Sequence, residues 1–203
     1  MIGILNYGLG NVSAFSNVFN KLNVASKLVD SCADLFDVDK IILPGVGSFD
    51  YAMQCFNDSG LREEVDRLVL MEKIPVLGVC VGLQMMAKSS EEGQLDGLNW
   101  LDATVQKFDI DPLKTGYPLP HMGWNELEVL REDPILEGLH NSRFYFLHSY
   151  FLQPKKYNEV IASSDYRGKF CSVIRHENIY GMQCHPEKSH AFGLKFLNNF
   201  AEI

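Results

Sequence analysis

The chain has 203 residues, of which 46% are hydrophobic and 22% charged. This composition supplies a sizeable core and excludes a disordered chain. The formal net charge of -8 disfavours nucleic acid as a partner, because phosphate binding needs a basic surface. No apolar run approaches the roughly 18 residues of a membrane span. The odd number of cysteines, five, without a close CxxC pair is typical of a reducing compartment, so we expect a cytoplasmic protein.

The first half alternates short apolar runs with amphipathic stretches. Helices are predicted at residues 12–22, 49–56, 61–71 and 81–88, and strands at residues 2–7, 26–30, 40–43 and 75–79. This alternation is typical of βαβ units. It predicts an α/β fold of the flavodoxin-like kind, with an open, mostly parallel central sheet and helices on both faces.

The second half consists mainly of aromatic and β-branched runs separated by turns. These runs are found at residues 103–108, 127–130, 143–152, 159–162, 170–175 and 179–183, and Asn178 predicts a hairpin between the last two. A closing helix is predicted at 191–201, after the Ser189-His190 start signal. Without a linker, repeat or low-complexity segment, residues 1–203 are predicted to form a single domain with antiparallel additions to its sheet.

A candidate nucleophile lies in Gly78-Val79-Cys80-Val81-Gly82, between a predicted strand and a predicted helix. This is the context of a nucleophile elbow, where flanking glycines avoid collisions around a strained residue. The helix N-terminus favours a thiolate, and the N–H of Val81 can face an oxyanion. The alternative is an ordinary strand-to-helix turn with a buried cysteine.

A candidate base lies in Gln183-Cys184-His185-Pro186-Glu187, between the last strand and the last helix. Glu187 can hold one side of the His185 imidazole while the other nitrogen faces a nucleophile, as in a catalytic triad. The alternatives are a structural histidine and a glutamate that caps the following helix. Combined with the elbow, the motif favours covalent catalysis by Cys80, His185 and Glu187.

A third motif, Leu43-Pro44-Gly45-Val46-Gly47, ends a predicted parallel strand. Ligands of open α/β sheets bind at that edge, and glycines allow backbone N–H groups to approach them closely. The motif therefore predicts a second oxyanion donor, whose loss typically costs about 2.7–4 kcal/mol of barrier. A glycine-rich turn without a catalytic role is the alternative.

Together these motifs resemble the class I, or triad-type, glutamine amidotransferases, and the resemblance spans nearly the whole chain. It is carried by LPGVGSF at 43–49, GVCVGLQ at 78–84 and HPEKS at 185–189. Within the family the chain is most similar to the glutaminase subunits of imidazole glycerol phosphate synthase, from histidine biosynthesis. The marks of that subgroup are Asn6-Tyr7-Gly8 with Gly10-Asn11, PGVG at 44–47, PHMGWN at 120–125 and His148-Ser149-Tyr150.

The resemblance implies the class I glutaminase fold and a mechanism. Cys80 attacks the amide of L-glutamine, His185 transfers protons, Glu187 orients it, and a γ-glutamyl thioester is hydrolysed after ammonia leaves. No metal or cofactor is expected. The oxyanion hole would use amides near Val46 and Gly47, with Val81. Glutamine would be bound by Gln84, Glu92, Ser149 and Tyr150.

The resemblance also implies a partner, a TIM-barrel cyclase that receives ammonia through an internal tunnel. The family's interface positions correspond to Asn11, Met122, Trp124, Tyr145 and Lys188. An indole and a methionine in a glycine-containing loop are typical of an interface anchor, although a core position is an equal alternative. Asn11 fits equally well as a helix N-cap.

Four other functions fit parts of the sequence. Gly8-Leu9-Gly10 with Asp30 resembles a dinucleotide-binding fingerprint, but Ser13 occupies its third glycine position. A related glutaminase that supplies ammonia to a surface-polysaccharide sugar is the main alternative, because His190 and Leu98-Asn99-Trp100 depart from the histidine-pathway pattern. The complete Cys80 triad disfavours a non-catalytic scaffold, and Gln84 with the HPE motif disfavours a peptidase.

Overall fold

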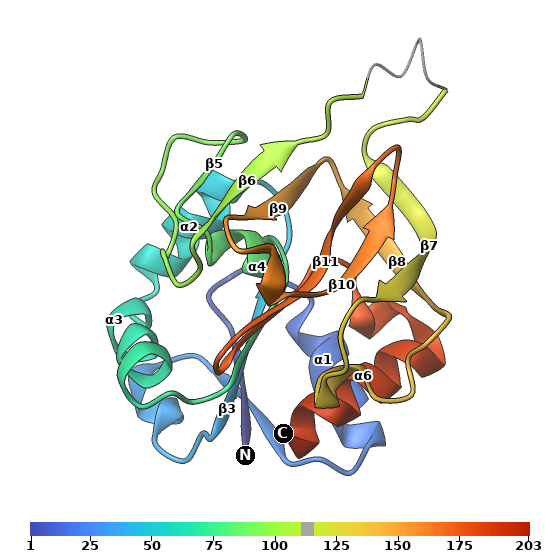
Figure 1. Cartoon of the computed structure of the whole chain (residues 1–203). Helices are drawn as coiled ribbons and strands as arrows, with labels where there is room; N and C mark the ends of the chain where they lie inside the picture. Colours follow the sequence, from blue (N-terminus) through green and yellow to red (C-terminus); the bar gives the residue numbers. More distant parts are fainter. Residues whose placement is uncertain (111–115) are drawn as a thin grey trace.

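A large mixed sheet organises the molecule (Figure 1). The structure is a computed structural model that describes residues 1–110 and 116–203. In the described residues the sheet has nine strands, in the order β2-β1-β3-β4-β12-β11-β10-β7-β8. Neighbours from β2 to β12 pair in parallel, and those from β12 to β8 pair antiparallel. This confirms the predicted α/β sheet with antiparallel additions.

The parallel strands are short and, except for the edge strand β2, nearly continuous in their burial, as expected for strands covered on both faces. Their bounds are β1 Ile2–Leu5, β2 Ser26–Val29, β3 Lys40–Gly45, β4 Val76–Cys80 and β12 Ile179–Met182. The antiparallel strands are β7 His121–Val129, β8 Ser142–His148, β10 Val160–Asp165 and β11 Lys169–His176. A separate small sheet contains β5 Ser89–Ser90, β6 Ala103–Lys107 and β9 Tyr150–Pro154.

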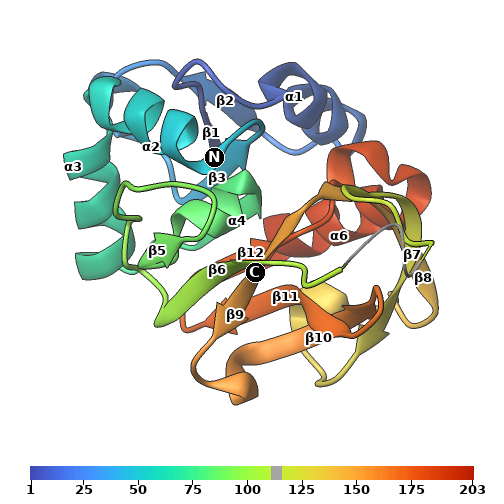
Figure 2. The same ribbon diagram turned by 90° about the horizontal axis from the view of Figure 1, so that it is seen from above.

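Helices cover both faces of the sheet, as predicted (Figure 2). One layer contains α1 Val12–Lys21 and α6 His190–Glu202, which contact each other. The other contains α2 Phe49–Asp58, α3 Arg62–Asp66 and α4 Val81–Met85. Helical turns complete the set: η1 Cys32–Leu35, η2 Arg67–Met71, η3 Pro134–Leu136, η4 Tyr157–Glu159 and η5 Pro186–Lys188. No described helix is long and apolar enough to cross a bilayer.

Strand register places two distant motifs side by side. β4 pairs in parallel with β12, so that Val79 lies opposite Met182. Cys80 follows Val79 directly, and His185 comes three residues after Met182. Because parallel strands end at the same edge of a sheet, both side chains reach the same place. On the other side of β4, Gly45 of β3 lies opposite Cys80.

Four segments differ from the prediction, and the first is the helix predicted at 81–88, which ends at Met85. Residues 120–125, expected as a loop, belong mostly to β7, which pairs with β8 from His121 to Leu127. The run predicted at 143–152 divides at Ser149 into β8 and β9, which belong to different sheets. The helix predicted at 61–71 changes from α to π geometry at Arg67. The predicted hairpin at Asn178 is confirmed by the antiparallel pairing of β11 with β12.

Candidate active site

Cys80 occupies a strained turn between β4 and α4. Its backbone has φ 55° and ψ -111°, and the residue is only 3% exposed. Close packing requires the glycines nearby, because a Cβ on Gly82 would lie 2.0 Å from the carbonyl oxygen of Leu43. A Cβ on Gly45 would lie 2.3 Å from the Gly82 nitrogen. A non-glycine residue at positive φ in a tight strand-to-helix turn is the geometry of a nucleophile elbow.

His185 and Glu187 form the second part of the site. The Nδ1 of His185 donates to the Oε1 of Glu187 over 2.9 Å, and the two side chains are 4% and 2% exposed. The backbone of His185 is fixed on both sides: its N–H donates to the carbonyl of Tyr145, and its own carbonyl accepts from the Ser189 hydroxyl. Ser189 Oγ also accepts the N–H of Tyr145, so that β8 and η5 hold the imidazole in place.

The two motifs are electrically coupled. Burial lowers the pKa of His185, but hydrogen bonds with Cys80 and Glu187 outweigh burial and raise this pKa to about 10. The imidazole therefore holds its proton at neutral pH. A protonated imidazole beside a thiol stabilises the thiolate, which is the nucleophilic form of cysteine. Cys80 Sγ also lies 3.9 Å from the carbonyl oxygen of Leu147 and 3.9 Å from the Nε2 of Gln183.

A pocket of about 290 Å³ opens onto Cys80 and His185. Its lining includes Cys80 and His185 together with most of the other residues predicted to bind or stabilise a substrate. These further lining residues are Val46, Gly47, Val81, Glu92, Ser149 and Tyr150. The structure thus brings members of the three predicted groups, catalytic, oxyanion and glutamine-binding, to one cavity, whereas Glu187 and Gln84 are not among its lining residues. Val81 is the first residue of α4, so its N–H has no acceptor within the helix and can serve an oxyanion.

Two of the predicted glutamine-binding side chains already have protein partners. Gln84 is buried, and its Nε2 donates to the carbonyl of Tyr150 over 2.9 Å and to the Oε1 of Gln183 over 3.1 Å. Glu92 lines the pocket while its Oε2 accepts the N–H of Phe49 at the start of α2. Their direct contact with glutamine stays a prediction, and both also shape the pocket through these bonds.

Among the residues predicted at the interface with a partner, Lys188 lines the pocket. Met122 and Trp124, on the outward side of β7, are 65% and 42% exposed, which favours the interface over the core alternative. The Trp124 ring meets the edge of Tyr145 at 6.1 Å, and the Lys188 ammonium lies 5.9 Å from the Tyr145 ring. Asn11 is the N-cap of α1, since its Oδ1 accepts from Ala14, as the alternative proposed.

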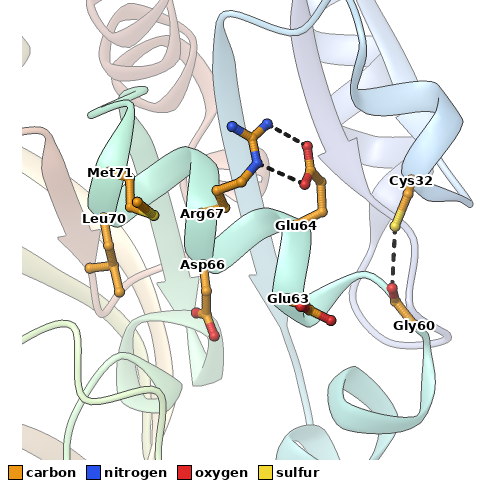
Figure 3. Close-up of a pocket in the computed structure, with 8 residues that line it drawn as sticks. All are labelled: Cys32, Gly60, Glu63, Glu64, Asp66, Arg67, Leu70 and Met71. Carbon is orange, nitrogen blue, oxygen red and sulfur yellow. Dashed lines mark hydrogen bonds and ion pairs between the residues drawn. The ribbon is translucent and has the colours of Figure 1, made fainter.

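A second hollow lies on the α3 side of the molecule and is lined by acidic groups and Arg67 (Figure 3). Arg67 is bonded to Glu64, and the Cys32 thiol lies 3.3 Å from the carbonyl of Gly60. Cys32 has no histidine beside it in this hollow, which therefore lacks the base that a nucleophilic thiol needs. Among the described residues, no group of three or more metal-ligating side chains is placed to hold a metal ion.

Comparison with known proteins agrees with this geometry. The family model for glutamine amidotransferase class-I matches residues 4–203. The imidazole glycerol phosphate synthase subunit HisH of Leptospira interrogans is 48% identical over the full length of both chains, and that of Bdellovibrio bacteriovorus is 45% identical. The chain belongs to the HisH group of the class-I glutamine amidotransferases. The predicted family and its glutamine-hydrolysing enzyme class are confirmed.

Solved structures show the same fold at lower identity. A crystal structure of a glutamine amidotransferase superimposes with a TM-score of 0.76 at 20% identity, covering 100% of this chain and 99% of the other. The structure of PurLQS from Thermotoga maritima gives a TM-score of 0.71 at 15% identity, with 99% and 97% covered. The class-I amidotransferase fold is therefore retained where most of the sequence has changed.

Two departures from the subgroup pattern have structural explanations in this amidotransferase. Trp100 is 4% exposed, and its Nε1 donates to the carboxylate of Asp66 over 2.7 Å, so it belongs to the core. His190 stacks on Trp124 with ring centroids 5.2 Å apart. The glycine loop resembling a dinucleotide site serves packing, because a Cβ on Gly10 would lie 2.7 Å from the Cβ of Pro44.

Sequence reasoning assigned no role to some residues that support the amidotransferase site. Gln183 and Ser189 flank His185, and Ser189 was predicted only as part of a helix start, because a motif does not reveal which backbone groups a hydroxyl contacts across the chain. The buried pair His121 and His148 was also given no function, although both residues lie in subgroup motifs. Their proximity depends on the pairing of β7 with β8, which the predicted loop at 120–125 concealed.

Proposed function

We propose that the chain hydrolyses L-glutamine through a thioester on Cys80 and supplies the ammonia to a separate cyclase subunit that forms imidazole glycerol phosphate. The convergence of Cys80 and the Glu187-bound imidazole of His185 on one pocket is the observation that carries this proposal. We further propose that the protein works in the cytoplasm, where its five free thiols stay reduced.

The first half-reaction releases ammonia. The Cys80 thiolate attacks the side-chain amide carbon of glutamine, and the carbonyl electrons move to its oxygen. The oxyanion would accept hydrogen bonds from the N–H of Val81 and from backbone near Gly47, which lines the same pocket. As the tetrahedral intermediate collapses, His185 gives its proton to the departing nitrogen, which leaves as ammonia. A γ-glutamyl thioester remains on Cys80.

The second half-reaction restores the enzyme. His185, now neutral, takes a proton from water, and the resulting hydroxide equivalent attacks the thioester carbonyl. The carbon–sulfur bond breaks, glutamate leaves, and the Cys80 thiolate is again beside a protonated imidazole. Glu187 supports both steps because its buried carboxylate stabilises the charged ring and fixes its orientation.

The proposed partner surface comprises Met122, Trp124, Tyr145 and Lys188. Lys188 lines the cavity in which ammonia would be released, its ammonium lies 5.9 Å from the Tyr145 ring, and Trp124 meets the edge of the same ring. Exposed aromatic and methionine side chains are typical anchors of protein interfaces. The relatives that align over the full length of this chain are named as subunits of imidazole glycerol phosphate synthase, which supports a cyclase partner.

The test uses the chain co-purified with the cyclase subunit encoded by the same organism. Cys80→Ala should abolish glutamine hydrolysis and glutamine-dependent synthesis, while synthesis driven by added ammonium salt continues. Cys184→Ala is the matched control, because this thiol is fully buried in the core. Retained glutamine hydrolysis in the Cys80 variant would refute the thioester. If wild-type complex forms no product from the phosphorylated aminoimidazole-ribotide precursor, the proposed acceptor is wrong.

A further inference from the structure

Two buried histidines lie at the substrate pocket without belonging to the triad, and one of them, His148, is among its lining residues. His121 begins β7 and His148 ends β8, and the two residues face each other in the strand register. They are 3% and 6% exposed. The Nδ1 of His121 lies 3.1 Å from the Nε2 of His148. Burial lowers the pKa of His121 to about 4 and that of His148 to about 3, so both rings are neutral at physiological pH.

The bonding pattern determines which nitrogen of each ring carries the proton. His148 Nδ1 lies 2.8 Å from the carbonyl oxygen of Tyr150, which can only accept, so this nitrogen must donate. In a neutral ring Nε2 is then an acceptor, and it must receive the Nδ1 proton of His121. The Nε2 of His121 is an acceptor in turn, and the Nδ2 of Asn125 lies 3.3 Å from it. The chain of donors therefore runs in one direction, from Asn125 to Tyr150.

The far end of this chain is anchored to backbone. Asn125 Nδ2 donates to the carbonyl of Asp165 over 2.8 Å, and its Oδ1 accepts the N–H of Glu126. These bonds fix the orientation of the amide. The ring of His121 is held between two aromatic rings, with centroids 4.9 Å from Phe146 and 4.0 Å from Tyr166. His121 therefore has one preferred position from which to orient His148.

The near end of the chain is the wall of the substrate pocket. The carbonyl of Tyr150 accepts from both His148 and Gln84, over 2.8 and 2.9 Å. Ser149 and Tyr150 line the pocket at the point where the chain passes from β8 into β9. Two converging donors on one carbonyl restrict the rotation of that peptide, and so they fix the surface that the wall presents.

We propose that His148, oriented by His121, is a positioning residue that sets the affinity for glutamine by fixing the Ser149–Tyr150 wall. The inference rests on the proposed function, because it assigns that wall to glutamine. His148 acts through the Tyr150 carbonyl, whereas the reactivity of Cys80 depends on His185 and Glu187. Substitution of His148 should therefore raise KM for glutamine more than it lowers kcat.

The principal variant is His148→Phe, which keeps an aromatic ring but removes the donor to Tyr150. We expect KM for glutamine to rise about 3- to 10-fold, the range typical for one lost hydrogen bond. The rate of Cys80 alkylation by iodoacetamide, followed by peptide mapping, should stay within about twofold of wild type. His148→Asn places an amide donor near the position of Nδ1 and should restore part of the affinity. All assays use the complex with the cyclase subunit.

A double-variant cycle tests whether His121 acts through His148. His121→Phe preserves the stack with Phe146 and Tyr166 but leaves Nε2 of His148 without a donor, so it should also raise KM. In the double variant His121→Phe/His148→Phe, KM should equal that of His148→Phe alone, because the second ring no longer has a donor to orient. Independent packing effects would instead multiply the two increases.

Each outcome has one interpretation. Multiplied KM effects, or a His148→Phe variant with unchanged KM and slowed Cys80 alkylation, would overturn the inference. If His148→Phe does not fold, as judged by its thermal unfolding, His121→Phe and His121→Asn carry the test, since only the asparagine keeps a donor toward His148. A wild-type complex that does not hydrolyse glutamine would refute the proposed function instead. Normal wild-type hydrolysis with normal variants would refute the inference alone.

Discussion

Replacement of Glu187 by glutamine tests how the triad makes its thiolate. The variant keeps the size of the side chain and can still bond the imidazole, but it removes the negative charge 2.9 Å from Nδ1 of His185. Since the hydrogen bonds of the His185 ring with Cys80 and to the Glu187 carboxylate together hold the pKa of His185 at about 10, losing the carboxylate should lower this pKa. The proton then returns more readily to the Cys80 sulfur.

The size of the effect follows from the burial of the pair. Both side chains are at least 96% buried, so solvent screens their interaction little. A hydrogen bond to a charged group contributes about 1.5–3 kcal/mol, which corresponds to roughly a 10- to 150-fold change in an equilibrium. We expect the kcat of glutamine hydrolysis to decrease by a factor within this range, because the charge on His185 must be maintained in the transition state.

The assay combines kcat of the assembled enzyme with the rate at which iodoacetamide alkylates Cys80 near neutral pH. Both should fall in Glu187→Gln. Glu177→Gln is the matched control, because Glu177 is 59% exposed and pairs with Lys73 at the surface. If Glu187→Gln alkylates and turns over like wild type, the carboxylate does not stabilise the imidazolium, and the electrostatic account of the triad is refuted.

Three further predictions concern packing, positioning and pH. Gly82→Ala should destabilise the fold by about 1–3 kcal/mol in urea unfolding, since its Cβ would lie 2.0 Å from the backbone oxygen of Leu43. Ser189→Ala should lower kcat and cost about 1–3 kcal/mol of stability, because it leaves the N–H of Tyr145 without its acceptor. Acid should destabilise the protein through His148, because the pKa of this side chain is about 3 in the folded protein and 6.5 in the unfolded chain. The stability that the neutral ring contributes is complete above pH 6.5 and is progressively lost toward pH 3. The loss is on the order of 3 kcal/mol at about pH 4.

Matched variants separate these effects from general damage. Gly8→Ala introduces only the strain of its positive φ, with no atom within 4 Å of the new Cβ, and should cost less than Gly82→Ala. Ser13→Ala changes an exposed serine and should leave kcat unchanged. The unfolding free energy of His148→Phe should depend less on pH below about 6.5 than that of wild type. Equal pH slopes for the two proteins would contradict the assignment of the acid effect to this histidine.

The sequence predicts the triad better than it predicts the wall beside it. Cys80, His185 and Glu187 are each marked by local features, a glycine-flanked turn and a proline between two functional groups, so short segments suffice. The wall depends on Ser149, where one predicted run divides between two sheets. No glycine or proline marks that division, because the change of partner is decided by β6 and β7, which are distant in the sequence.

In the sheet, likewise, some strands were predicted correctly and others were not. The parallel strands β1, β3 and β4 have continuous apolar runs that identify them without their neighbours. β7 was missed at its start because Pro120 and Gly123 are typical of loops. Its alternation, with His121 inward and Met122 outward, is stabilised by pairing with β8 rather than by local propensity. The pairing of β7 with β8 therefore forms a part of the site that local sequence patterns do not predict.

The parallel pairing of β4 with β12 has a consequence for how this architecture can vary. Cys80 ends β4 and His185 comes three residues after the end of β12, so their separation is set by two very short stretches of chain. Almost a hundred residues lie between the two strands, and they include α4 and β8, which contact the turn at Cys80 and the backbone of His185. Insertions in turns of that interval that leave α4, β8 and the alignment of Val79 with Met182 in place should be tolerated, whereas one residue added between Met182 and His185 should abolish activity.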